Sequence, residues 1–280
     1  MIIAIALTAV VCIGGTYMLT SSSSDNTTLK LEGSTTLSPL MEYYAEEFEK
    51  TTGVRVEITS NGSSFGISSV MDNPARAHIG LSSSGYGAAA HKTAGVKETP
   101  IGWDSVVLIA GSNAPAQLTR AQVEGIYKGE IKNWNEVGGT AGTIVPIERD
   151  AGSGTRDYFE GRFTLTGKPN LTALGTSQAV IEAVEGNPNA IAYVSFGSVG
   201  NANVKVIALD YNDGKGFVNP KTNFADYPLK RVVVLLTNGE PTGIAAVFIG
   251  WVLSSEGQKL MEEEGSITPF SVLACPPYPT

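Results

Sequence analysis

The spacing of hydrophobic residues changes repeatedly along the chain between a strand-like and a helix-like pattern. Residues 29–32 favour a short strand. The apolar side chains that follow recur every three or four positions, as on one face of a helix: Leu37, Leu40, Met41, Tyr44 and Phe48. Residues 54–59 then alternate between apolar and polar side chains, which predicts a second strand. This order of elements predicts a βαβ unit.

The same alternation of elements continues to the end of the chain. We expect helices around residues 67–71, 118–127, 155–163, 179–184, 245–253 and 258–264, and strands around 77–81, 106–110, 143–147, 190–194, 204–209 and 231–236. Such alternation predicts an α/β fold with a largely parallel sheet, in which ligands bind at the carboxyl ends of the strands. Three Ser-rich turns fall at such ends, at residues 33–36, 61–64 and 82–85.

The first residues have a different pattern. Residues 1–24 contain no charged side chain, and residues 2–19 form a long apolar run. A run of this length is near the lower limit for a membrane-spanning helix and longer than the core of a typical signal peptide. We expect a membrane anchor or signal segment over residues 1–20 and a Ser- and Thr-rich linker over 21–28, with the rest of the chain outside the cytoplasm. A buried core helix is the alternative, and cleavage of this segment or lipidation of Cys12 stays open.

Composition excludes several classes of function. The 280 residues include 27 Asp and Glu against 19 Lys and Arg, for a formal net charge of −8. We therefore expect no nucleic-acid partner, because binding a phosphate backbone needs a basic face. The chain has two cysteines and two histidines, and their spacing matches no zinc motif. We expect no metal site, no disulfide framework and no cofactor.

Four short segments combine the groups that bind anions: residues 33–36, 62–64, 82–84 and 149–155. They offer hydroxyls, glycines that allow close approach of the backbone, and free N–H groups at predicted helix N-termini. Arg149 adds a planar donor fork that carries a permanent charge. Together these groups predict a desolvated anion pocket with one full positive charge.

Each of these features has a simpler interpretation when taken alone. A Ser or Thr before a helix is commonly just an N-cap, and a single arginine commonly lies at the surface or in an ion pair. An enzyme is a weaker alternative. Gly152, Ser153 and Gly154 lack the GxSxG spacing of a nucleophile elbow, and no histidine is a credible partner for Ser153. No GxxxxGK[ST] loop indicates a nucleotide site. We therefore predict no catalytic residues and keep a hydrolase only as an alternative.

Four ordered motifs resemble those of one family of binding proteins. Residues 118–122 (LTRAQ), 126–134 (IYKGEIKNW) and 138–139 (GG) are close to that family's LTxxQ, IfxGxIxxW and GG segment. Residues 149–155 match its RxxGSGT loop, and residues 33–36 and 62–64 match its first two ligand turns. Over about residues 28–270 the chain resembles the phosphate-binding (PstS-type) proteins of bacterial and archaeal phosphate ABC importers.

The resemblance implies an α/β, two-lobed periplasmic-binding-protein fold of type II, each lobe a mainly parallel sheet flanked by helices, with two hinge crossings. Lobe 1 is expected to combine residues 29–103 with 229–275, and lobe 2 to span 104–228. Inorganic phosphate is expected between the lobes of a monomer that delivers it to permease subunits of an ABC importer. The residues expected to contact phosphate are Thr35, Thr36, Ser63, Arg149, Ser153, Gly154 and Thr155, with Ser34 adjacent.

One position departs from the family pattern. Some members carry an aspartate in the third turn that accepts a hydrogen bond from a protonated oxygen of phosphate, which lets the site reject sulfate. The matching residue here is Ser83, which can donate or accept, and Asp104 is a second candidate for that acceptor. Both are included among the candidate site residues. A binder of another tetrahedral oxyanion, such as sulfate or molybdate, and an anchored phosphate sensor stay open as alternatives. The tail around Cys275 also departs from the family and has no assigned role.

Overall fold

A computed structural model of the chain describes residues 28–270. The helices are α1 (Ser38–Thr52), α2 (Ser63–Met71), α3 (Ala89–Ala94), α4 (Arg120–Lys128), α5 (Gly154–Arg162), α6 (Ser177–Glu185), α7 (Gly243–Val252), α8 (Ser255–Glu264) and the 3₁₀ helix η1 (Trp134–Val137). The strands are β1 (Leu29–Gly33), β2 (Val56–Ser60), β3 (Ile79–Ser82), β4 (Lys97–Ala110), β5 (Gln117–Thr119), β6 (Val145–Arg149), β7 (Thr172–Leu174), β8 (Ala190–Ser195), β9 (Lys205–Val206), β10 (Ala208–Asp210), β11 (Phe217–Val218) and β12 (Lys230–Thr237).

The predictions for residues 1–20, for nearly all of the linker over 21–28, for Cys12 and for Cys275 lie outside these described residues. Within residues 28–270, no helix combines the length and apolar character needed to cross a membrane.

The main sheet continues from one end of the molecule to the other. Its strand order is β2-β1-β3-β12-β4-β8-β6-β7, with β9 paired to β4. The strands β2, β1 and β3 are parallel at one end, and β8, β6 and β7 are parallel at the other. Between them β12 and β4 are antiparallel to each other and to their outer neighbours. The parallel strands were predicted from the sequence; the antiparallel pair in the middle was not.

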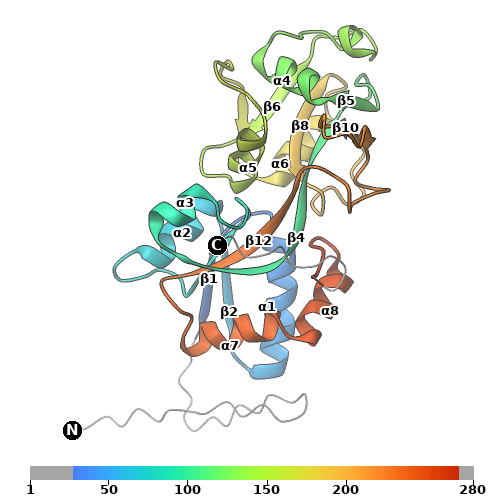
Figure 1. Ribbon diagram of the computed structural model, residues 1–280. Helices are drawn as coiled ribbons and strands as arrows, with labels where there is room; N and C mark the ends of the chain where they lie inside the picture. Colours follow the sequence, from blue (N-terminus) through green and yellow to red (C-terminus); the bar gives the residue numbers. More distant parts are fainter. Residues whose placement is uncertain (1–27, 271–280) are drawn as a thin grey trace, which may run out of the picture.

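The two ends of this sheet form two lobes. Figure 1 shows β4 and β12 running between a lower body and an upper body. We call the lower body, with β1 to β3, α1 to α3, α7 and α8, the first lobe, and the upper body, with β5 to β11 and α4 to α6, the second lobe. The two strands are the two hinge crossings of the expected fold class. Our residue boundaries at 103–104 and 228–229 fall within β4 and beside β12, and they stay a prediction.

Helix ends follow from local sequence chemistry. Thr119 caps α4: its side chain accepts from the N–H of Gln122, and the Gln122 side chain accepts from the N–H of Thr119. Gly53 ends α1 in the left-handed region at φ 72°, where its N–H donates to the carbonyl of Glu49. Ser153 caps α5 through a bond from the N–H of Arg156. These caps set where each helix begins or ends relative to the turns that precede it.

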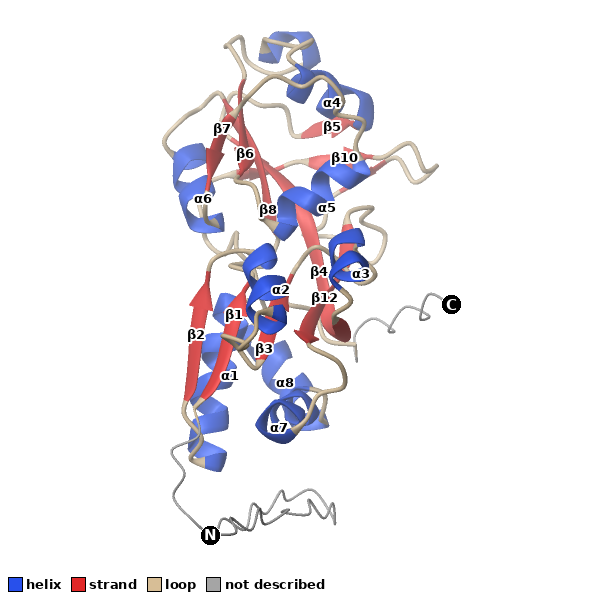
Figure 2. Ribbon diagram, turned by 90° about the vertical axis from the view of Figure 1, so that its left-hand side faces the viewer, coloured by secondary structure: helices blue, strands red, loops and turns tan. Residues whose placement is uncertain are grey.

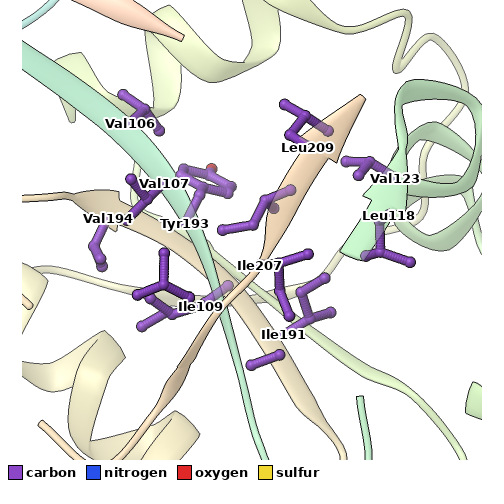
Figure 3. Packing of buried hydrophobic residues seen from close by; sticks show 14 of the residues in the cluster. Val106, Val107, Ile109, Leu118, Val123, Ile191, Tyr193, Val194, Ile207 and Leu209 are labelled. Atoms are coloured by element: carbon purple, nitrogen blue, oxygen red, sulfur yellow. The ribbon is translucent and has the colours of Figure 1, made fainter. Parts of the chain in front are cut away.

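Each lobe has its own hydrophobic core. In the first lobe, the aromatic rings of α1 and α7 pack edge to face, as with Phe48 and Phe248 at 5.1 Å between ring centroids. In the second lobe, Phe159 of α5 stacks on Tyr193 of β8 at 4.0 Å. Figure 3 shows part of this second core, where β4 and β8 meet. The contact between Phe159 and Tyr193 holds α5 against the sheet, with the N-terminus of α5 facing the first lobe. In Figure 2, α5 lies directly above α2 and α3.

Candidate anion-binding site

Three buried serines of the first lobe lie together. Ser34 follows β1, Ser63 opens α2 after β2, and Ser83 follows β3. Because the three strands are parallel neighbours, their carboxyl ends share one edge of the sheet. The hydroxyl of Ser34 donates to Oγ of Ser83 at 2.7 Å, and the N–H of Ser83 donates to Oγ of Ser63 at 3.1 Å. The Oγ atoms of Ser63 and Ser83 are 3.4 Å apart. The Ser-rich turns thus form one hydroxyl cluster.

The second lobe contributes Arg149, at the end of β6. The side chain is buried, and its donors are held by second-lobe groups on three sides. Nε donates to the carbonyl of Leu174 at 3.2 Å, and Nη2 to that of Gly175 at 2.6 Å. Nη1 donates to Oγ of Ser177 at 3.2 Å, and Nη2 also reaches across to Oγ1 of Thr35 in the first lobe at 3.1 Å. In the described part of the chain, none of these acceptors is a carboxylate.

The first turn of α5 closes against the first lobe. A Cβ atom on Gly154 would lie 2.3 Å from Oγ of Ser63 and 2.6 Å from the backbone nitrogen of Ser84, so only glycine fits there. The Oγ1 atoms of Thr36 and Thr155 lie 3.2 Å apart, each from a different lobe. The structure therefore brings hydroxyls of the first lobe and the N-terminus of α5 into direct contact.

A second buried arginine, Arg231 of β12, also lies in this cluster. It was not among the predicted site residues. Its Nε and Nη2 donate to Oδ2 of Asp104 at 2.9 and 2.7 Å, and Oδ1 of Asp104 accepts from the hydroxyl of Ser195 at 2.7 Å. Both carboxylate oxygens of Asp104 already accept from the protein. A role for Asp104 as the acceptor of a ligand proton stays a prediction.

The electrostatic cost of the site falls on Arg149. Burial lowers the pKa of the Arg149 guanidinium from its ordinary value, and the charge of Arg231 acts in the same direction. The neighbouring charge of Asp150 opposes the shift in pKa without outweighing it. A cation destabilised in this way is stabilised when an anion binds beside it.

His91 contacts the turn at residues 82–85 from the protein interior. Its Nε2 lies 2.7 Å from Oγ of Ser82 and its Nδ1 lies 2.5 Å from Oε1 of Glu98. The carboxylate of Glu98 also accepts from the N–H of Gly87 at 2.9 and 3.1 Å. Serine, histidine and carboxylate here have the order of a hydrolase triad. Ser82, however, is fully buried, so its hydroxyl is closed to a substrate and orients the turn instead.

The family model for the PBP superfamily domain matches residues 20–256, most of the chain. An X-ray structure of a Clostridium perfringens protein, assigned as a phosphate ABC transporter substrate-binding protein and solved with bound phosphate, is 33% identical. It superposes with a TM-score of 0.76 over 86% of this chain and 99% of that one. The chain is a PstS-type member of the PBP superfamily.

Two further relatives of this PstS-type chain support the assignment. The phosphate-binding protein PstS of Bacillus subtilis is 27% identical over 252 residues, 85% of this chain and 80% of that protein. The crystal structure of an ABC-type phosphate transport receptor from Vibrio cholerae is 27% identical, with a TM-score of 0.67 over 86% of this chain and all of that one. The recognition and the fold class inferred from the sequence are confirmed.

All ten predicted site residues of this PstS-type chain lie at the boundary between the lobes. The first lobe provides Ser34, Thr35, Thr36, Ser63 and Ser83; the second provides Arg149, Ser153, Gly154 and Thr155; and Asp104 lies on β4. Their role as ligand contacts stays a prediction. The sequence carried one signal for the missed Arg231, a charged residue opening an otherwise apolar run. That pattern is also typical of an exposed strand end, so it did not single Arg231 out.

Proposed function

We propose that this protein captures inorganic phosphate between its two lobes and delivers it to the permease of an ABC importer. One observation carries the proposal: Arg149 is buried without a carboxylate partner in the described chain, at a point where hydroxyls of both lobes meet. A buried charge without a counterion is costly, and a small anion supplies that counterion. The net charge of −8 does not prevent this, because the positive charge is local.

The surrounding groups suit a tetrahedral oxyanion. The Thr35 hydroxyl lies beside Arg149, and the Thr36 and Thr155 hydroxyls meet across the lobes. The first turn of α5 adds backbone N–H groups and the positive end of its dipole. Charge-assisted hydrogen bonds contribute roughly 1.5–3 kcal/mol each. Desolvation and lobe closure offset most of that sum, and we expect a net of about −8 kcal/mol, a micromolar affinity or better.

The relatives support phosphate as the ligand. The Clostridium perfringens protein was solved with phosphate bound, and the Bacillus subtilis and Vibrio cholerae proteins are named for phosphate binding and transport. We carry this ligand over to the present chain, together with a role in transport in which no bond is made or broken. We further propose that the lobes work outside the cytoplasm as a monomer, held at the membrane by residues 1–20.

The test is calorimetric titration of the full chain with phosphate and then with sulfate near neutral pH. We expect phosphate to bind with micromolar or tighter affinity and sulfate to bind at least about a thousandfold more weakly, because phosphate alone still carries a proton that the site can recognise. Failure of phosphate to bind at millimolar concentration contradicts the proposal.

A binder of another tetrahedral oxyanion is the second candidate, and one observation favours it. The third turn carries Ser83 in place of a carboxylate, and both oxygens of Asp104 are engaged by Arg231 and Ser195. A site that lacks a free carboxylate distinguishes protonated from unprotonated anions less sharply. Sulfate binding within about tenfold of phosphate, in the same titration, favours this candidate.

A further inference from the structure

Arg231 is a buried arginine whose donors are all used within the protein. Nε and Nη2 each donate one hydrogen bond to Asp104. The second hydrogen of Nη2 is donated to Oγ1 of Thr155 at 3.0 Å. Nη1 donates to the carbonyl of Gly154 at 3.2 Å and to the carbonyl of Ser83 at a shorter distance. A guanidinium has five N–H donors, so none is left over for a ligand.

The acceptors of Arg231 belong to both lobes. Ser83 lies in the first lobe, after β3, whereas Gly154 and Thr155 open α5 in the second. Arg231 itself lies on β12, the strand by which the chain returns from the second lobe to the first. Its bonds to Ser83 and Gly154 therefore exist together only while the lobes are closed on each other. Opening must break at least one of the two.

Arg231 also orients the hydroxyls nearest to it. Oγ1 of Thr155 accepts from Nη2 at 3.0 Å, and Oγ1 of Thr36 lies 3.5 Å from the same nitrogen. A hydroxyl whose oxygen already accepts from a guanidinium turns its own proton toward another acceptor. Arg149 acts in the same way on Thr35, at 3.1 Å. Thr36 and Thr155 also hydrogen bond to each other at 3.2 Å, which uses one of their two protons. With Thr155 already accepting from Arg231, the pair therefore presents one donor outward, which is the role an oxyanion requires.

Asp104 keeps this second arginine from adding to the charge of the site. The ion pair between Arg231 and Asp104 is almost wholly shielded from solvent, with side-chain exposures of 0% and 1%. Its net charge is zero, so the unpaired positive charge stays at Arg149. Such a pair is costly to break, because loss of either partner leaves a buried charge uncompensated.

We propose that Arg231 is a positioning residue of the anion site. It occupies the hydroxyl oxygen of Thr155, so that the pair of Thr36 and Thr155 presents a donor to the anion, and it fastens the two lobes in the closed form. It makes no bond to the ligand itself. This inference rests on the proposed function, in that it describes how the same site holds its anion. If the proposal holds, two properties depend on Arg231. Phosphate is released slowly, and the form of phosphate that carries fewer protons binds more tightly.

The experiment measures release of radiolabelled phosphate, and phosphate affinity on both sides of the pH at which phosphate loses its second proton. The variants are Arg231→Lys, Arg231→Met and the double variant Arg231→Met/Asp104→Asn, which removes both charges of the ion pair and so adds no new buried unpaired charge. The matched control is Lys230→Met, the neighbouring cation of β12, whose side chain donates to the carbonyl of Ala225 away from the site.

We expect both Met variants to release phosphate about tenfold to a hundredfold faster at a nearly unchanged association rate, because one to two charge-assisted bonds between closed lobes are lost. Arg231→Lys keeps the charge but loses the planar guanidinium, so its release rate should lie between those of the Met variants and the native protein. The freed oxygen of Thr155 can then accept a hydrogen bond from the ligand, so the Met variants should bind protonated phosphate relatively better than the native protein does.

A folded double variant with the native release rate, or with the native dependence of affinity on pH, overturns the inference. Failure of the proposed function has a different signature, since the native protein itself then does not bind phosphate. In that case the same release measurements with labelled sulfate decide the role of Arg231, because the argument concerns any tetrahedral oxyanion.

Discussion

The two buried arginines of the site differ in one respect, the presence of a counterion. Arg149 and Arg231 are 1% and 2% exposed and lie in the same cluster of side chains. Arg231 is bonded to Asp104, whereas Arg149 is held by carbonyls and hydroxyls. Carbonyls and hydroxyls satisfy its hydrogen bonds without an ion pair, and the neighbouring charge of Asp150 offsets only part of the cost of burying it. We therefore propose that the counterion distinguishes an anion-binding arginine, Arg149, from a positioning one, Arg231.

Placing a carboxylate near Arg149 should make it resemble Arg231. Ser153→Asp keeps the N-cap of α5, since aspartate caps as well as serine does. A like charge about 4 Å from the anion costs about 4 kcal/mol at an effective dielectric constant of about 20, so phosphate affinity should fall about a thousandfold or more in calorimetry. Ser153→Asn, which caps without charge, is the control. Equal affinities of the two variants contradict this account of the site.

Removing the uncompensated charge is the direct test of the comparison. Arg149→Met should weaken phosphate binding by at least about a hundredfold, because a buried charge-assisted donor pair is lost. The control is Arg120→Met, an arginine of the same lobe that pairs with Glu124 on the surface of α4. If both variants bind as the native protein does, Arg149 is a structural arginine only.

The contact between the lobes, which Arg231 bridges, is sensitive to the size of one residue. Gly154→Ala places a methyl group against Ser63 and Ser84 of the first lobe. We expect incomplete closure, an affinity about tenfold weaker, and a radius of gyration in X-ray scattering that shrinks less on addition of phosphate. The control is Gly161→Ala in the same helix, where nothing lies within 4 Å of the added carbon. Native closure by Gly154→Ala would show that the observed contact is not required.

Neutralising Asp157, a carboxylate at the edge of the site, should change phosphate affinity less than any variant above. Oδ2 of Asp157 accepts from the Ser84 hydroxyl at 3.3 Å, and burial raises the pKa of this carboxyl above its ordinary value. Asp157→Asn keeps an acceptor and removes a repulsive charge, so phosphate should bind about twofold to fivefold more tightly at low salt. The control is Glu256→Gln on α8, which takes no part in the site.

The same variant has a defined dependence on pH. Because the pKa of Asp157 is raised, its carboxylate becomes protonated at a higher pH than an ordinary aspartate. The advantage of Asp157→Asn over the native protein should therefore be present at neutral pH and disappear as the pH falls through that pKa. An advantage that persists in acid contradicts the assignment of the effect to charge.

Local patterns predicted the turns that form the site. The apolar periodicity of α1 and the alternation of β2 place the turns of the first lobe. The candidate residues from these turns and from the loop after β6 were predicted because each short segment carries its own chemistry.

What the sequence did not predict depends on contacts between distant segments. Arg231 and Asp104 are register partners on β12 and β4, although 127 positions separate them. The first part of β4 was missed because Lys97, Glu98 and Pro100 do not read as a buried strand. His91 lies on a six-residue helix without a predicted apolar stripe, so its place between Ser82 and Glu98 emerged only from the fold.

A single strand serves two cores, and this has a thermodynamic consequence. Ile101 of β4 packs in the core of the first lobe, while the part of β4 from Val106 to Ala110 packs in that of the second. Detachment of β4 exposes apolar surface in both lobes at once. Heating should therefore give one cooperative unfolding transition in calorimetry, where independent lobes would give two. Phosphate should raise the temperature of that transition as a whole, because only the folded chain binds it.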